Sequence, residues 1–167
     1  MYFLENKFFN LSLKGLHYKV FDKYLKNKDF SQIEKHLQVF LDKYLINFFY
    51  MPALNRAYTA IKENHYMVLL TSAPSFLAEP IFKMLKFNEY RSSIYKVNKK
   101  NKFESISYIL DGLGKAEIVS KYKNDEITVY SDSMEDFPLF ELATNKVCVN
   151  PCKKLKKIAK NLNWEII

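Results

Sequence analysis

The stretch ITVYSDSMEDFPLFELA, residues 127–143, decides the fold, because an apolar strand runs directly into a turn that carries Asp132 and Asp136. Carboxylates at the end of a buried strand are costly unless a cation or a hydrogen-bond network balances them. Such oxygen atoms suit Mg²⁺, which takes one or two carboxylates together with water and phosphate oxygens. The alternative is that Asp136 caps the following helix, with Pro138 in its first turn.

Strands and helices alternate on both sides of this stretch. Strands are predicted at 66–71 (YMVLLT), 127–131 (ITVYS), 146–150 (KVCVN) and 164–167 (WEII). Helices are predicted at about 53–64, 75–86 and 115–122. Two further helices are predicted, a short one that runs through Leu142 and a lysine-rich one after residue 150. The segment 91–110 is ambiguous, and short strands are one interpretation of it. The alternation predicts an α/β fold with a Rossmann-like parallel sheet flanked by helices.

The chain before Pro52 has a different, helical character. Ser31 and Glu34 form a capping-box pattern. Apolar residues then recur at helical spacing and give one broad apolar face: Ile33, Leu37, Phe40, Leu41, Tyr44, Leu45 and Phe48. We therefore expect residues 1–50 to be helical and residues 51–167 to form the α/β core.

A second candidate for chemistry is VLLTSAP, where Thr71 ends an apolar strand just before a helix. Ligands bind outside the carboxyl ends of parallel strands, and free amides at a helix N-terminus attract anions. The alternative is that Ser72 or Ser75 simply caps the helix.

A third candidate is DGLGKAEIVSKY, in which Gly112 and Gly114, two of the three glycines in the chain, precede Lys115. Glycine permits close approach of the backbone to a ligand, and a lysine near a helix N-terminus is otherwise disfavoured by the helix dipole. Chance placement is the alternative, because lysine is abundant here.

Composition argues against several other classes of protein. The formal net charge is +8, but Arg56 and Arg91 are the only arginines, and the lysines are spread along the whole chain, so we expect no nucleic-acid partner. The run YLINFFYM at 44–51 is too short to span a bilayer, and no signal sequence opens the chain. Cys148 and Cys152 lack further metal ligands. We expect reduced cysteines, no membrane association and a cytoplasmic location.

Together, the Thr-ended strand, the Gly-preceded Lys and the segment from YSDSMEDF through VCVNP to NWEII resemble the haloacid dehalogenase (HAD) superfamily, in its phosphoserine-phosphatase-like branch with a helical cap. The resemblance implies a Mg²⁺-dependent phosphomonoester hydrolase that works through an aspartyl-phosphate and acts on a phosphorylated small molecule. It implies that Thr71 binds the phosphoryl group, Lys115 balances its charge, Asp132 ligates Mg²⁺, and Asp136 supports both the metal shell and catalysis.

The resemblance also identifies what does not match. The family's nucleophile lies in an Asp-x-Asp motif after its first strand, and this sequence contains no Asp-x-Asp. Asp22, Asp29 and Asp42 lie in helical, lysine-rich surroundings and cannot be matched to it. Residues 1–50 resemble a remnant of the cap, and residues 51–167 the core without its first strand, so we expect an N-terminally truncated chain with little or no activity alone.

In the family, the missing strand lies between the strands that end at Thr71 and Ser131. Three outcomes are open: these strands pair directly, residues 1–4 (MYFL) fill the slot, or a separate polypeptide adds a strand. The competing functional hypothesis is a non-catalytic module that keeps a phosphate and metal pocket in order to sense or dock. A basic protein that binds RNA or membranes is disfavoured, because its lysines form no single face.

Overall fold

The computed structural model describes residues 11–167, which fall into two compact units. Within these residues the first unit comprises 11–49 and 67–109, and the second comprises 50–66 and 110–167. The predicted cap remnant at 1–50 concerns family relationships, which this division by contacts does not test. The predicted alternative in which MYFL fills a slot in the sheet lies outside the described residues.

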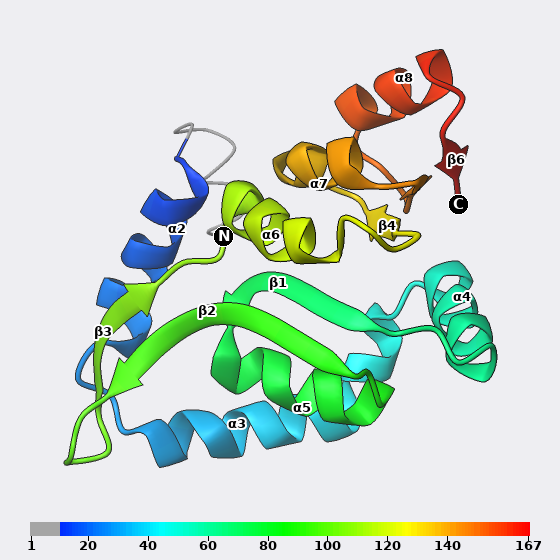
Figure 1. Ribbon diagram of the computed structural model, residues 1–167. Helices are drawn as coiled ribbons and strands as arrows, with labels where there is room; N and C mark the ends of the chain where they lie inside the picture. The colour runs from blue at the N-terminus through cyan, green and yellow to red at the C-terminus, as the bar shows by residue number, and fades with distance from the viewer. Residues whose placement is uncertain (1–10) are drawn as a thin grey trace. The chain divides into compact units, whose positions relative to one another are not determined.

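The first unit combines helices with a mixed three-stranded sheet (Figure 1). Its elements are α2 (Leu13–Val20), the π-helical turn η1 (Phe21–Leu25), α3 (Phe30–Lys43), the 3₁₀ turn η2 (Leu45–Phe48), β1 (Val68–Pro74), α5 (Ser75–Leu85), β2 (Glu89–Val97) and β3 (Phe103–Tyr108). The strand order is β1-β2-β3, with β1 parallel and β3 antiparallel to β2. The ambiguous segment 91–110 therefore contains strands, which form an antiparallel pair.

An aromatic cluster forms the core of the first unit. Phe21, Tyr95 and Phe103 are buried, and the partly buried residues packed against them are Leu25, Phe30, Ile33, Phe76 and Ile106. The rings meet edge to face, with 5.4 Å between the centroids of Phe21 and Tyr95 and 5.4 Å between those of Phe76 and Phe103. This geometry places the positive ring edge on the negative ring face. The cluster joins η1 and α3 to the sheet.

The predicted capping box at Ser31 is wrong in its position. Asp29 is the N-cap of α3, and its carboxylate accepts hydrogen bonds from the amides of Ser31 and Gln32 at 2.9 and 3.3 Å. Asp is as good an N-cap as Ser and accepts these bonds two residues earlier. The Ser31 hydroxyl instead accepts a hydrogen bond from the side-chain amide of Asn101.

The second unit contains a fully parallel three-stranded sheet in the order β4-β5-β6. Its elements are α4 (Met51–Lys62), α6 (Gly112–Val119), the 3₁₀ turn η3 (Ser120–Tyr122), β4 (Thr128–Ser131), the 3₁₀ turn η4 (Met134–Asp136), α7 (Phe137–Leu142), β5 (Asn145–Cys148), α8 (Lys153–Asn161) and β6 (Glu165–Ile166). Each predicted strand of this region is present, because each is a short apolar run bounded by turn residues.

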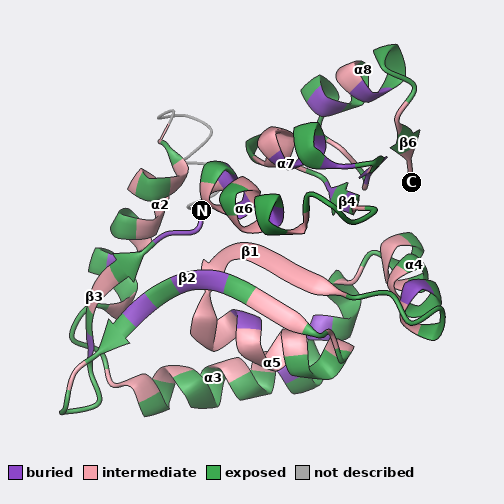
Figure 2. Cartoon of the chain, viewed as in Figure 1, coloured by how far each residue is buried: buried purple, intermediate pink, exposed green. Residues whose placement is uncertain are grey.

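Helices and aromatic rings cover this sheet. Helix α8 buries Leu155 and Ala159 and exposes its lysines, a two-sided pattern that Figure 2 shows in purple and green. Trp164 stacks on Phe137 with 6.0 Å between ring centroids and lies 5.1 Å from the ring of Phe140. These contacts fix α7 beside the C-terminal strand.

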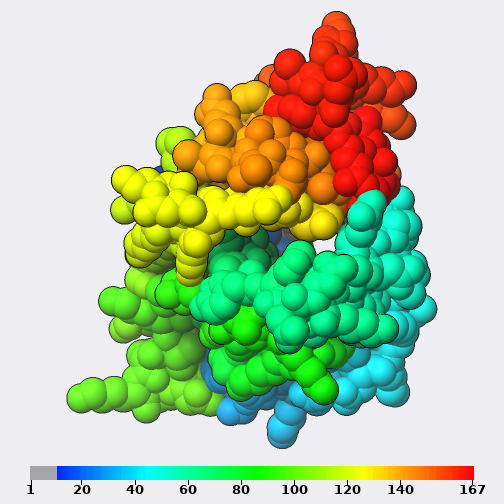
Figure 3. Space-filling view, turned by 45° about the vertical axis from the view of Figure 1, so that its right-hand side comes forward, coloured from blue at the N-terminus to red at the C-terminus, as the bar shows by residue number. Residues whose placement is uncertain are grey.

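The C-terminal strand also contacts α4. Arg56 of α4 forms an ion pair with Glu165 of β6, and Figure 3 shows the red C-terminal segment beside the blue-green segment of α4. Both side chains are about half exposed, so the pair contributes little to stability. It joins the middle of α4 to the first residue of β6.

The α/β class with parallel strands flanked by helices is confirmed, and the antiparallel β3 is an addition to it. No helix within residues 11–167 is both long and apolar enough to cross a lipid bilayer.

A partly buried polar contact in the first unit predicts pH-dependent stability. Nδ1 of His17 lies 2.8 Å from the hydroxyl of Tyr95, which can donate to it when the imidazole is neutral. Burial lowers the pKa of His17 below 6.5 and raises the pKa of Tyr95 to about 12. Because the unfolded chain binds the His17 proton more readily, this contribution to stability is complete above pH 6.5 and is lost as pH falls through the lowered pKa.

We therefore expect chemical denaturation of the chain to show lower stability at pH 5.5 than at pH 8. His17→Phe should remove part of this difference, while His36→Gln, at an exposed position, should leave it unchanged. An equal pH dependence in wild type and His17→Phe would contradict the prediction.

Candidate active site

A buried ion pair joins α6 to the turn after β4. Nζ of Lys115 donates to Oδ1 of Asp136 at 2.7 Å, and the two side chains are only 8% and 13% exposed. The hydroxyl of Ser131, at the end of β4, donates to the other carboxylate oxygen at 2.7 Å and accepts from the amide of Ser133. Both oxygens of Asp136 are thus occupied. We call Lys115, Ser131 and Asp136 the charge cluster.

The charge cluster explains an unfavourable feature of the sequence. Lys115 lies in the first turn of α6, where the helix dipole opposes a positive charge, and the partly buried carboxylate of Asp136 compensates for it. Asp136 does precede α7, but its side chain makes no capping hydrogen bond. The alternative that Asp136 acts as a helix cap is therefore wrong for its side chain.

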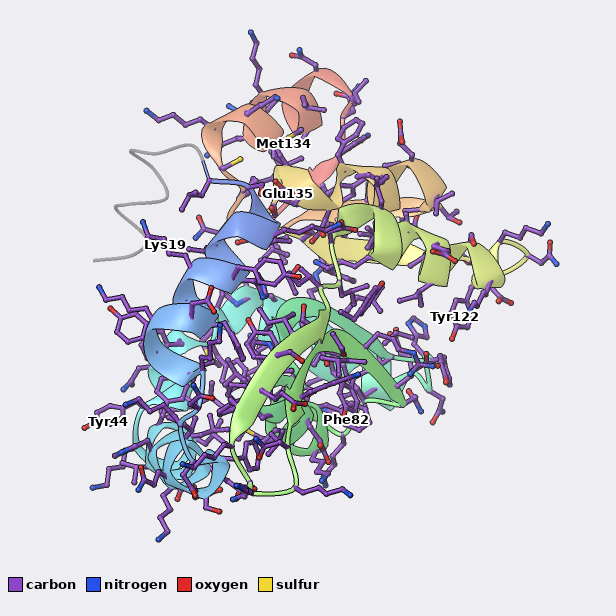
Figure 4. All side chains as sticks on the ribbon, turned by 90° about the vertical axis from the view of Figure 1, so that its left-hand side faces the viewer. Lys19, Tyr44, Phe82, Tyr122, Met134 and Glu135 are labelled. Atoms are coloured by element: carbon purple, nitrogen blue, oxygen red, sulfur yellow. The ribbon has the colours of Figure 1, made fainter. Side chains whose placement is uncertain are left out.

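Gly112 permits α6 to approach this turn. A Cβ atom built on Gly112 would overlap the backbone carbonyl of Glu135, so no other residue fits without a shift of the backbone. Asp111 caps the helix by accepting from the amide of Gly114 at 3.0 Å. The sequence predicted that this glycine lets the backbone approach a ligand. In the structure it lets α6 pack against the turn η4. Met134 and Glu135 of that turn are labelled in Figure 4.

Asp132 follows Ser131 and differs from Asp136 in its surroundings. It is exposed, and within residues 11–167 its carboxylate has no recorded hydrogen bond or ion pair. It lines a pocket of about 340 Å³ together with Tyr50, Ala53, Tyr130, Ser131, Val149 and Asn150. Its carboxylate is therefore available to a ligand.

The carboxylate oxygens of Asp132 and Asp136 are the candidate ligands for Mg²⁺. The described residues contain no group of three or more His, Cys, Asp or Glu side chains that could enclose a metal ion. An open Mg²⁺ site needs only one or two carboxylates, because water and phosphate oxygens complete the octahedron. Asp132 fits that requirement. Direct ligation by Asp136 stays a prediction, since both of its oxygens have protein partners.

Thr71 belongs to the first unit, and Lys115, Asp132 and Asp136 belong to the second. Strand β1 continues past Thr71 to Pro74, and the Thr71 hydroxyl accepts from the amide of Ala73 at 3.1 Å. Within residues 11–167 no side chain caps α5, so the alternative of a cap from Ser72 or Ser75 is wrong. Amides in the first turn of a helix have no partner inside the helix and are suited to bind an anion.

Sequence reasoning missed the roles of two residues. Ser131 was predicted only as the end of a strand, although a hydroxyl at a buried position beside two acids is a usable signal, since buried polar groups need partners. Asn150 lines the pocket next to Asp132 and has a positive φ of 39°. An Asn followed by Pro at the end of a strand is the signal that could have identified it.

Comparison with known proteins defines the class. The family model of haloacid dehalogenase-like hydrolases matches residues 8–141, most of the chain. The chain therefore belongs to this family, which confirms the resemblance inferred from the sequence.

Relatives of known sequence or structure include phosphoserine phosphatases. Phosphoserine phosphatase SerB1 of Mycobacterium tuberculosis is 36% identical over 67 residues, which cover 36% of this chain and 22% of the relative. The matched part is thus about a fifth of that protein.

The structural neighbours share the fold at low sequence identity. A protein of unknown function from Bordetella pertussis Tohama I has a TM-score of 0.73 at 18% identity, covering 84% of this chain and 67% of that one. A probable phosphoserine phosphatase from Vibrio cholerae has a TM-score of 0.71 at 15% identity, covering 98% of this chain and 50% of that one.

The contact at Gly112 predicts a sharp difference between two glycines. Gly112→Ala should lower the free energy of unfolding of the second unit by about 3 kcal/mol, because the new methyl group must displace backbone. Gly15→Ala is the control: its Cβ would lie 3.4 Å from Oγ of Ser12, an ordinary contact, and replacing a helical glycine stabilises by up to about 1 kcal/mol. Denaturant titration followed by circular dichroism measures both. Equal stability of the two variants would contradict the prediction.

Proposed function

We propose that this chain is the phosphate- and magnesium-holding part of an HAD-type phosphomonoester hydrolase whose substrate is a phosphorylated small molecule. The observation that carries the proposal is the charge cluster, which pairs a buried lysine with Asp136 and reaches Ser131, the residue directly before the exposed Asp132 at the carboxyl end of β4. Ligands bind at that edge of parallel sheets. Membership of the family supports the reaction class.

Each residue has a separate role in the proposal. The Lys115 ammonium, oriented by Asp136, neutralises negative charge on a phosphoryl group. The phosphoryl-binding role of the Thr71 hydroxyl stays a prediction from the sequence. Asp132 holds Mg²⁺, which when bound would withdraw charge from the phosphoryl oxygens. Fixed charges of this kind stabilise a transition state because they need no reorganisation during the reaction.

The covalent step needs a group that these 167 residues do not supply in the family's pattern. The sequence has no Asp-x-Asp, and a carboxylate nucleophile is what divides the hydrolysis into two easier steps. We propose that the attacking aspartate comes from outside the chain, and that the chain alone is inactive. The two cysteines are free, as in a reducing compartment, and the cytoplasm is the proposed location.

The sheet edges support a partner polypeptide. Within the described residues β1 pairs only with β2 and β4 only with β5, so each is the terminal strand of its sheet. β1 carries no charged residue over Val68–Pro74, whereas natural edge strands usually carry charges that prevent pairing. We propose that a separate polypeptide adds an apolar strand there.

A non-catalytic phosphate sensor is the second candidate. The absence of Asp-x-Asp favours it, since the charge cluster can bind an anion without any chemistry. Turnover after addition of a partner strand would support the hydrolase hypothesis over the sensor hypothesis.

We expect Mg²⁺ and inorganic phosphate together to bind the 167-residue chain. Asp132→Ala should weaken the binding of Mg²⁺ by at least about tenfold, because the metal loses its carboxylate. Asp132 is exposed, and within residues 11–167 its carboxylate makes no hydrogen bond or ion pair, so the variant should fold normally. Asp22→Ala, which removes another exposed carboxylate, serves as the control and should leave binding unchanged. Calorimetry measures both, and equal metal affinity in wild type and Asp132→Ala would refute the magnesium role.

The strand proposal predicts a response to an added peptide. A synthetic apolar strand that ends in Asp-x-Asp should raise the melting temperature of the chain and confer Mg²⁺-dependent hydrolysis of small phosphomonoesters. A peptide with Asn in place of both Asp residues should stabilise without turnover. Turnover by the chain alone, or a melting temperature unchanged at saturating peptide, would contradict the proposal.

A further inference from the structure

The pocket beside Asp132 lies at the carboxyl ends of two neighbouring parallel strands. Ser131 and Asp132 come from the end of β4, Val149 and Asn150 follow β5, and the remaining lining residues are Tyr50, Ala53 and Tyr130. Ser131 belongs to both the pocket wall and the charge cluster, since its hydroxyl donates to Asp136. The pocket wall and the charge cluster therefore share Ser131.

Backbone hydrogen bonds clamp the turn that carries Asn150. The amide of Val149 donates to the carbonyl of Ser131 at 2.9 Å, and the amide of Cys152 donates to that of Asp132 at 3.4 Å. The amide of Asn150 itself donates to the carbonyl of Ile167 at 2.8 Å. The turn is thus tied to both neighbouring segments.

This clamp holds Asn150 in a costly conformation. Its φ is 39°, in the left-handed region, and the following Pro151 further restricts the backbone. Strained residues persist where the surrounding structure determines them, often at ligand sites. The other Asn residues with positive φ, among them Asn163, are not part of the pocket lining.

The pocket is lined by aromatic rings and by polar side chains that are available to hydrogen-bond with a ligand. Tyr50 and Tyr130 are 42% and 41% exposed. Within residues 11–167 the side-chain amide of Asn150 has no recorded hydrogen bond, and neither does the carboxylate of Asp132. A volume of about 340 Å³ suits a small organic group. If Asp132 is committed to a cation, Asn150 remains the pocket's amide acceptor.

We infer that Asn150 is a specificity-determining residue that accepts a hydrogen bond from a hydroxyl or ammonium group on the organic part of the phosphorylated substrate. The inference rests on the proposed function, in which Asp132, a residue of the pocket lining, holds Mg²⁺ beside the phosphoryl group. Tyr50 and Tyr130 provide apolar walls for its carbon atoms, and their rings also favour an ammonium group.

Four probes test the inference on the 167-residue chain with Mg²⁺ present: inorganic phosphate, ethyl phosphate, glycerol 1-phosphate and phosphoethanolamine. NMR titration gives the dissociation constants. A probe that donates to Asn150 should bind about three- to tenfold more tightly than ethyl phosphate, which corresponds to one hydrogen bond. A comparison of the dissociation constants of glycerol 1-phosphate and phosphoethanolamine shows whether Asn150 prefers a hydroxyl or an ammonium donor.

Two substitutions and a control connect the preference to Asn150. Asn150→Gly removes the side chain while tolerating the positive φ, and it should abolish the preference. Asn150→Asp should shift selectivity towards phosphoethanolamine, because it adds a negative charge. Asn163→Gly makes the same backbone change at φ 54° outside the pocket and should preserve the preference.

The outcomes separate the inference from the proposed function. A preference that survives Asn150→Gly, or ethyl phosphate binding as tightly as the other esters, overturns the inference while phosphate binding stands. If inorganic phosphate does not bind, the proposed function fails and the inference fails with it.

Discussion

The second unit depends on the buried ion pair between Lys115 and Asp136. A lysine that is 8% exposed is stable only if its charge is compensated, and removal of either partner would leave an unpaired buried charge. Formation of the pair requires α6 to lie against η4, which in turn requires Gly112 at the contact with Glu135. The need to compensate one buried charge thus determines where α6 lies, how closely its backbone approaches Glu135, and how the turn after β4 is oriented.

The need to compensate the charge of Lys115 gives Asp132 and Asp136 different surroundings, although both follow the same strand in the sequence. Asp136 accepts hydrogen bonds from Lys115 and Ser131 on its two carboxylate oxygens. Asp132 lies four residues earlier, exposed at the pocket, with its carboxylate available to a ligand. The structure therefore gives the two neighbouring acids different surroundings, and the phosphate and magnesium roles proposed above follow that difference.

Most strands and helices could be predicted because they are apolar runs bounded by turn residues, as at 127–131 and 146–150. The segment 91–110 could not, since β2 buries Ser92 and Ser93 and so hides the alternation; Ser93 is accommodated by donating to the carbonyl of Ser72. The importance of Lys115 and Asp136 was visible in sequence, but their pairing was not. It depends on a contact between residues more than twenty positions apart, which local patterns do not encode.

Trp164 is the only tryptophan in the chain, and it packs on Phe137 and Phe140 in the second unit. Its fluorescence consequently reports on that unit, whereas the first unit, built around Tyr95 and its phenylalanine neighbours, contributes only tyrosine and phenylalanine signals. The molecule thus carries an intrinsic optical label on the half that holds the charge cluster. Comparing tryptophan emission with the far-ultraviolet signal of the whole chain shows whether the two units unfold together or in sequence.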